Sequence, residues 1–289
     1  MDRKAIARET LEIMKQGYYL LPPGAPGLAP GDIIPKRIAV AEDMKYSVEN
    51  SLLLSPSQGE ALLKKYERNR LPPQSLQAIR DKTVTKNLAT VAAIRRLHAE
   101  GKDKIGVLNF ASAKNPGGGF LNGAMAQEES LAASGTLYRA LVSHEEYYRE
   151  NRASRSMMYL DYAIYAPDVL FFRDGSFRLV ADPVKASVLT LPAVNMGQVL
   201  QKGEDAEKAE AVMRRRMKLA LCIFAEQGAK HLVLGAYGCG VFRNDPQKVA
   251  AWWQELLAEG MGSCFGTIFH AVLDRSPRQA CIRAFEEIG

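Results

Sequence analysis

The chain has 289 residues, of which 47% are hydrophobic, and its 38 Lys and Arg against 32 Asp and Glu give a net charge of +6. This composition supports a sizeable core and excludes wholesale disorder. The first ten residues mix both charges without an apolar signal core, and no run approaches the roughly 18 apolar residues of a membrane span. We therefore expect a cytoplasmic monomer with no membrane partner.

The sequence shows no pattern typical of a metal centre or a disulfide framework. No cysteine belongs to a Cys-x-x-Cys pair, and the four histidines lack ligand spacing. We expect no metal, no cofactor and reduced thiols at all four cysteines, which are Cys222, Cys239, Cys264 and Cys281. The densest basic run, at 214–218, lies in a helical pattern, which favours a solvated helix face over direct nucleic-acid binding.

Residues 1–84 are expected to form a mainly helical N-terminal cap. Short helices and strands are predicted there over residues 2–16, 36–42, 51–54 and 58–66. The Pro- and Gly-rich stretch 21–31 predicts a loop between the first two of these elements. A stronger helix is predicted from Val84 to Glu100, ended by Gly101.

Residues 85–289 show buried strands that alternate with helices. Strands are predicted over 105–111, 162–165, 169–173, 187–195, 231–235 and 265–273. Helices are predicted over 127–143, 205–227, 246–259 and 277–287. The pair Asp174-Gly175 between apolar residues indicates a β-hairpin. Strands with helices between them predict a three-layer α/β domain.

Three consecutive glycines, Gly117, Gly118 and Gly119, follow the strand predicted at 105–111. A tight turn needs only one or two glycines, and each glycine costs conformational entropy on folding. A glycine run at a strand end lets backbone N–H groups approach a bulky anionic ligand. We therefore interpret this segment as an anion-binding loop.

Gln127, Glu128 and Glu129 stand at the start of the next predicted helix. Acidic residues in a first turn are common because they complement the helix dipole. Directly after a ligand-binding loop, two adjacent carboxylates also indicate general acid–base chemistry. Adjacent helical residues point about 100° apart, so the spacing alone does not choose which carboxylate is the acid.

A second glycine-rich loop, Gly235 to Asp245, again follows a buried strand and precedes a helix. A dinucleotide oxidoreductase would need a first βαβ unit beside such a loop, and no such unit remains in the chain. The chain also lacks the Gly-Lys-Ser/Thr of a P-loop. Cys239 is interpreted as a small loop residue and not as a nucleophile, because no base is recognisable nearby.

The two motifs together, Gly117-Gly-Gly119 and then Gln127-Glu-Glu129 after seven residues, resemble the signature of the poly(ADP-ribose) glycohydrolase family. The segment Leu108-Asn-Phe-Ala-Ser-Ala-Lys-Asn-Pro116 is similar to the microbial branch of that family. The resemblance implies a three-layer α/β/α macrodomain with a mixed central sheet over 85–289. It also implies hydrolysis of the ribose–ribose O-glycosidic bonds of poly(ADP-ribose), in the exo mode, with release of ADP-ribose.

The resemblance further implies roles for single residues. Glu129 would protonate the leaving group, Glu128 would orient the distal ribose hydroxyls, and Gln127 would help to position the pair. Both glycine loops are expected to bind the ligand, through Gly117, Gly118, Gly119, Gly238, Cys239, Gly240, Val241 and Phe242. Ser112 and Asn115 are weaker candidates for ribose contacts.

Three other functions stay open at this point. An ADP-ribose-binding macrodomain without turnover is disfavoured by the intact Gln127-Glu-Glu129, because a reader needs no paired carboxylates near an anion. A hydrolase of mono-ADP-ribosylated substrates fits the same motif. A nucleotide-binding module with partners docking on residues 1–80 is the third. The expected partners are poly(ADP-ribose), ADP-ribose and ADP-ribosylated proteins.

Overall fold

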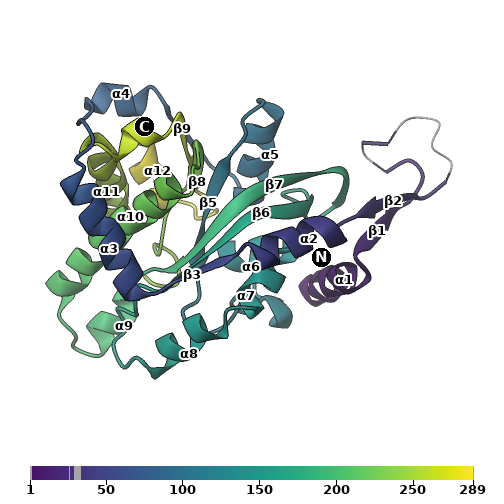
Figure 1. The fold of residues 1–289 in the computed structure, drawn as a ribbon, viewed down its shortest axis with the longest axis horizontal. Helices are drawn as coiled ribbons and strands as arrows, with labels where there is room; N and C mark the ends of the chain where they lie inside the picture. The colour runs from purple at the N-terminus through teal and green to yellow at the C-terminus, as the bar shows by residue number, and fades with distance from the viewer. Residues whose placement is uncertain (1, 26, 29–33, 289) are drawn as a thin grey trace.

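The computed structural model describes residues 2–25, 27–28 and 34–288, and Figure 1 shows their arrangement. The loop predicted at 21–31 therefore lies partly outside the described residues. Of the helices in these ranges, none combines the length and the apolar character that crossing a membrane requires.

The centre of the molecule is a seven-stranded sheet in the order β3-β6-β7-β5-β8-β9-β4. The strands are β3 (Leu52–Leu54), β4 (Thr83–Lys86), β5 (Ile105–Ala111), β6 (Ala163–Arg173), β7 (Leu179–Pro192), β8 (His231–Leu234) and β9 (Thr267–Ala271). The pairs β3–β6 and β6–β7 are antiparallel, and the remaining four pairs are parallel. The predicted mixed sheet is confirmed.

Helices cover both faces of this sheet. One face packs against α5 (Thr90–Ala99), α6 (Gln127–Ser134), α7 (Leu137–Val142) and α8 (Glu145–Ala153). The other packs against α3 (Pro56–Arg68), α4 (Leu76–Arg80), α9 (Met196–Gln201), α10 (Ala206–Glu226), α11 (Pro246–Ala258) and α12 (Ala280–Glu286). Adjacent residues of β5 face opposite cores, with Val107 on the first side and Leu108 on the second. The predicted three-layer architecture is confirmed.

The N-terminal residues add elements at one end of the sheet. Helix α1 (Arg3–Gln16) packs through Ala7 on Phe120 of the 3-10 turn η1 (Phe120–Asn122) and on Ala132 of α6. Strands β1 (Tyr18–Leu21) and β2 (Lys36–Ala39) form an antiparallel ribbon that extends from the molecule in Figure 1, and α2 (Ala41–Glu49) follows.

Two strands of the central sheet come from the expected cap. Strand β3 precedes residue 84, and β4 spans the expected boundary between residues 84 and 85. The N-terminal residues are therefore hydrogen-bonded into the sheet in addition to packing on it. The division into a cap and a catalytic domain stays a prediction.

Two predicted helices were wrong in extent. The stretch 84–100 begins as β4, which pairs with β9, and α5 starts only at Thr90. The stretch 127–143 is divided at Gly135, where a Cβ atom would collide with the backbone oxygen of Leu170. This close approach lets Gly135 bridge to Phe171 of β6, and helix geometry does not permit such pairing. Helices α2, α4, α8 and α9 were not predicted.

Candidate active site

A cavity of about 1020 Å³ lies beyond the carboxyl ends of the parallel strands β5, β8 and β9. Its walls come from the loops after these strands, from the first turn of α6 and from the β6–β7 hairpin at 174–177. Parallel sheets bind their ligands at this edge, because successive loops converge there. The volume is at the upper end of the range of small-molecule sites, about 300–1,000 Å³.

Glu128 lines this cavity and is almost fully buried, with 3% exposure. Its Oε2 accepts a hydrogen bond from the Ser112 N–H at 2.6 Å, and its Oε1 accepts one from Asn109 Nδ2 at 3.3 Å. Burial raises the pKa of Glu128 to about 8, and the hydrogen bonds only partly offset it. Glu128 is therefore mostly protonated at neutral pH.

Glu129 lies beside it in a different setting. The Gly119 N–H donates to Oε1 at 2.9 Å and the Ala126 N–H donates to Oε2 at 3.1 Å. The side chain is only half-buried and lines the cavity. Two backbone donors, one from the glycine loop and one from the residue before α6, thus fix the direction of this carboxylate.

Gln127 connects the start of α6 to β5 by hydrogen bonds. Its Oε1 accepts from the Phe110 N–H at 2.8 Å, and its Nε2 donates to the Leu108 oxygen at 2.9 Å and to Thr90 Oγ1 at 3.3 Å. Since both ends of the amide are held by β5 and α5, Gln127 sets the position of the two glutamates that follow. Its expected role in positioning the catalytic pair stays a prediction.

The three glycines pack against the glutamates. A Cβ on Gly118 would lie 3.0 Å from the Glu129 Cδ and 3.2 Å from the Glu128 Oε2, and the residue has a φ of 59°. The Gly119 N–H is donated to Glu129, and the Gly118 N–H to the Asn115 oxygen at 3.0 Å. In the structure, the absence of a side chain lets the backbone of this loop approach the glutamates closely. Ligand contact by these glycines stays a prediction.

The second loop, after the carboxyl end of the neighbouring parallel strand β8, forms another wall of the cavity. A Cβ on Gly238 would lie 2.7 Å from the Ala193 Cβ and 2.6 Å from Asn244 Nδ2, so only glycine fits there. Phe242 is half-buried and its ring centroid lies 5.9 Å from that of Tyr159. Val241 is 82% exposed at the rim.

Cys239 and Cys281 line the cavity together. The hydrogen bond that the Cys239 thiol donates to Cys281 and its burial raise the pKa of Cys239 well above its ordinary value. A thiol held in this protonated state is a poor nucleophile, which agrees with the interpretation of Cys239 as a small loop residue. Within the described ranges, no group of three or more His, Cys, Asp or Glu side chains is arranged to hold a metal ion.

Ten of the expected site residues line one cavity: Ser112, Asn115, Gln127, Glu128, Glu129, Gly238, Cys239, Gly240, Val241 and Phe242. The sequence reasoning missed Asn109, Tyr159 and Arg3. Asn109 could have been found, because an amide within the apolar run of β5 is a buried polar group that needs a partner. Tyr159 and Arg3 reach the cavity through tertiary packing, which no local pattern reveals.

Comparison with known proteins decides the family. Residues 7–174 match the family model described as microbial-type PARG, catalytic domain, where PARG stands for poly(ADP-ribose) glycohydrolase. The chain belongs to the microbial-type poly(ADP-ribose) glycohydrolase family. The predicted family, glycosidase class and macrodomain fold are thereby confirmed. None of the curated proteins compared with the chain matches it.

Solved structures of this family cover nearly the whole chain. The glycohydrolase of Thermomonospora curvata is 34% identical, with 99% of each chain covered and a TM-score of 0.86. Its complex with the inhibitor ADP-HPD gives 34% identity, 99% and 98% coverage and a TM-score of 0.85. The glycohydrolase of Deinococcus radiodurans in complex with ADP-ribose is 40% identical over 85% of this chain and 96% of that one, with a TM-score of 0.78.

Proposed function

We propose that the cavity binds the terminal ADP-ribose of poly(ADP-ribose), and that Glu129 is the general acid that cleaves the ribose–ribose bond. The observation that carries this proposal is the pair of adjacent carboxyl groups in the wall of one cavity, of which one is buried and fixed and the other is accessible. Solved relatives that bind ADP-ribose or ADP-HPD support the choice of ligand.

The loop amides support binding of the diphosphate. In the described part of the chain, the N–H groups of Gly238, Gly240, Val241 and Phe242 donate to no protein acceptor. Consecutive free amides in a tight loop form a concave site for an anion. The diphosphate of ADP-ribose is an anion of suitable size, and a pyrophosphate needs several donors at once.

The half-buried carboxyl group of Glu129 and the buried one of Glu128 suit two different tasks. Glu129 gives its proton to the departing ribose oxygen while the bond from that oxygen to the anomeric carbon breaks. A water molecule then bonds to the anomeric carbon and returns a proton to the Glu129 carboxylate. Glu128 is held by Asn109 and Ser112, and its fixed carboxyl group orients the hydroxyls of the distal ribose.

The N-terminal helix supports exo cleavage. Arg3 of α1 lines the cavity, and a Cβ on Gly123, in the loop before Glu129, would lie 3.4 Å from the Arg3 Cβ. Helix α1 therefore covers the rim beside the catalytic loop, where a continuing polymer would have to pass. A rim closed on this side admits a chain end more readily than a chain interior.

Release of ADP-ribose from purified poly(ADP-ribose) tests the assignment of the acid. The Glu129→Gln variant is expected to lose about 100-fold to 10,000-fold in rate, the usual contribution of a general acid, while it still binds ADP-ribose in calorimetry. Glu145→Gln is the matched control, since Glu145 is an exposed glutamate in the first turn of α8. Its rate should equal that of the wild type.

Near wild-type release by Glu129→Gln would contradict the assignment, and loss of activity in Glu128→Gln alone would move the acid role to Glu128. The same assay on mono-ADP-ribosylated protein shows whether ADP-ribosylated proteins are also substrates. Chain-length analysis of the early products separates the two cleavage modes, because exo cleavage yields ADP-ribose from the start.

A further inference from the structure

Two of the four cysteines lie side by side in the wall of the cavity. The Cys239 thiol, in the second glycine-rich loop, donates a hydrogen bond to Cys281, the second residue of α12. Both cysteines are free and half-buried, and since both line the cavity, a small molecule can reach them from it. The proposed cleavage of the glycosidic bond uses neither thiol.

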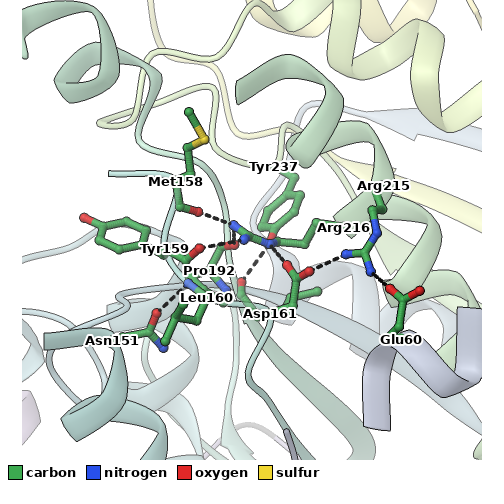
Figure 2. Close-up of polar contacts among 11 residues, drawn as sticks. Glu60, Asn151, Met158, Tyr159, Leu160, Asp161, Pro192, Arg215, Arg216 and Tyr237 are labelled. Atoms are coloured by element: carbon green, nitrogen blue, oxygen red, sulfur yellow. Dashed lines mark hydrogen bonds and ion pairs between the residues drawn. The ribbon is translucent and has the colours of Figure 1, made fainter. Parts of the chain in front are cut away.

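The loop that carries Cys239 is anchored just before this residue. Tyr237 is fully buried, and its hydroxyl donates to the Leu191 oxygen of β7 at 2.9 Å. Figure 2 shows its ring beside the guanidinium of Arg216. The Cys239 N–H donates to the Ala236 oxygen at 3.1 Å. The backbone at Cys239 therefore has a fixed position.

The segment that carries Cys281 is anchored by Asp274. Its Oδ2 accepts from the Cys281 N–H at 3.0 Å and from the Ile282 N–H at 3.3 Å. Asp274 is itself paired with Asn87, because its N–H donates to Asn87 Oδ1 at 3.0 Å and its oxygen accepts from Asn87 Nδ2 at 2.8 Å. Since separate hydrogen bonds hold each segment, the contact between the two thiols is built into the fold.

The cysteines differ in their expected reactivity. The hydrogen bond from Cys239 lowers the pKa of Cys281 below its ordinary value, although burial and the charge of Asp274 oppose the shift. Burial raises the pKa of Cys222 and of Cys264. Because the thiolate is the form that attacks an oxidant, Cys281 is the most reactive thiol. An accessible thiol of lowered pKa beside a second thiol is typical of a redox-sensitive pair.

We propose that Cys239 and Cys281 form a site of reversible oxidation, at which hydrogen peroxide converts the two thiols into a disulfide that joins the second glycine-rich loop to α12. First, the Cys281 thiolate attacks one peroxide oxygen and is oxidised to a sulfenic acid. The O–O bond breaks, and the other oxygen leaves as hydroxide, which takes up the proton that Cys281 released. Then the Cys239 sulfur bonds to the Cys281 sulfur, and the sulfenic hydroxyl leaves as water with the Cys239 proton.

The disulfide is expected to displace the loop beyond Cys239. A disulfide is shorter than a hydrogen bond between thiols, so its formation draws the loop towards α12. A Cβ on Gly238 would collide with two neighbouring side chains, whereas a Cβ on Gly240 would meet no atom within 4 Å. The loop therefore has room to move from Gly240 onward, where consecutive N–H groups donate to no acceptor in the described part of the chain. Their binding of a diphosphate rests on the proposed function, and under it oxidation weakens ligand binding.

Mass spectrometry of the full chain tests the disulfide without any ligand. Treatment with hydrogen peroxide and then alkylation of free thiols should lower the number of alkylated cysteines from four to two. Digestion should give a linked peptide pair that contains Cys239 and Cys281, and a thiol reductant should restore all four thiols. Cys264→Ser is the matched control and should form the same linked pair, whereas Cys281→Ser should form none.

Calorimetry with ADP-ribose on the same samples measures the consequence. The Kd of the oxidised wild type should exceed that of the reduced wild type by about tenfold or more, the cost of one lost hydrogen bond to a charged group. A thiol reductant should reverse the change. Peroxide should leave the Kd of Cys281→Ser at its own untreated value, and Cys281→Ala is measured in its place if the serine variant does not fold.

Four alkylated cysteines after peroxide treatment, or a linked pair that lacks Cys239 or Cys281, would overturn the inference. So would a linked pair with an unchanged Kd, or an equal rise of the Kd in peroxide-treated Cys281→Ser, since damage elsewhere would then explain the loss. Failure of the proposed function has a different signature, because the reduced wild type would then not bind ADP-ribose while the disulfide would still form.

Discussion

Glu128 and Glu129 are neighbours in the chain, yet their surroundings separate their chemistry. Glu128 is enclosed by Asn109 and Ser112, whereas Glu129 faces the cavity between two backbone donors. Sequence reasoning placed both at a ligand site but had no basis for this difference, because burial is decided by β5 and the glycine loop. The choice of Glu129 as the acid came from family resemblance, and its accessibility supports that choice.

The buried carboxyl group makes stability depend on pH. The pKa of Glu128 is raised from 4.5 to about 8. The contribution of this group to the free energy of unfolding is therefore fully present below pH 4.5 and is lost as pH rises through 8. At about 1.4 kcal/mol per pKa unit, the loss amounts to several kcal/mol. Denaturant titrations between pH 4.5 and 9 should show the free energy of unfolding of the wild type falling over this window.

The Glu128→Gln variant removes the ionisable group and should show a flatter profile over the same window. The Glu129→Gln variant serves as the comparison, since it removes the neighbouring carboxyl group and leaves the buried one. Identical pH profiles for the wild type and Glu128→Gln would show that Glu128 does not titrate in this way.

At the scale of elements, the sequence predicted the helices and strands that have a recognisable local residue pattern. Helices α1 and α10 follow apolar periodicity, strands β5 and β8 are short apolar runs, and all four were found. The strand β4 was missed because its partner β9 lies far along the chain, and an edge strand of four residues leaves no periodic signal. The break at Gly135 was also missed, since it depends on the closeness of Leu170.

The glycine loop itself was predicted, but the reason why it needs glycine was only partly predicted. Ligand access was the expected reason for Gly118, whereas the structure shows that a side chain would displace both glutamates. Gly118→Ala is therefore expected to lower kcat by about 100-fold or more, since an error of about 1 Å in a catalytic group has this cost. Release of ADP-ribose under saturating polymer measures it.

Gly203→Ala is the matched control. Gly203 has a φ of 67°, close to the 59° of Gly118, and a Cβ there meets no atom within 4 Å. Both variants therefore bear the backbone strain of a left-handed conformation, about 1–2 kcal/mol, and only Gly118→Ala moves the glutamates. Equal activities of the two variants would rule out the steric role of Gly118.

At the scale of the whole molecule, the N-terminal residues are joined to the catalytic helix by a buried polar cluster. Thr10 of α1 is fully buried and donates through Oγ1 to the Ala133 oxygen of α6 at 2.8 Å. Arg173 of β6 donates to the same oxygen at 3.2 Å and to Glu9 of α1 at 2.7 Å. Since α6 carries Glu129 one turn earlier, α1 braces the catalytic helix. The sequence predicted an N-terminal cap but not this contact.

Replacing Thr10 with Val tests this brace, because valine keeps the shape and removes the hydroxyl. The variant removes the Thr10 Oγ1 that accepts from Arg173 Nε and Nη2, each at 3.3 Å. It should lose about 1–3 kcal/mol of unfolding free energy. Hydrogen exchange should rise in α1 and in α6 together, since the two helices share the lost contact. Thr267→Val is the control, because Thr267 lies on β9, remote in the sheet order from β6, and should change exchange in neither helix. Faster exchange in α1 alone would mean that α6 holds its position without α1, and that the N-terminal helix acts on the cavity only through its rim.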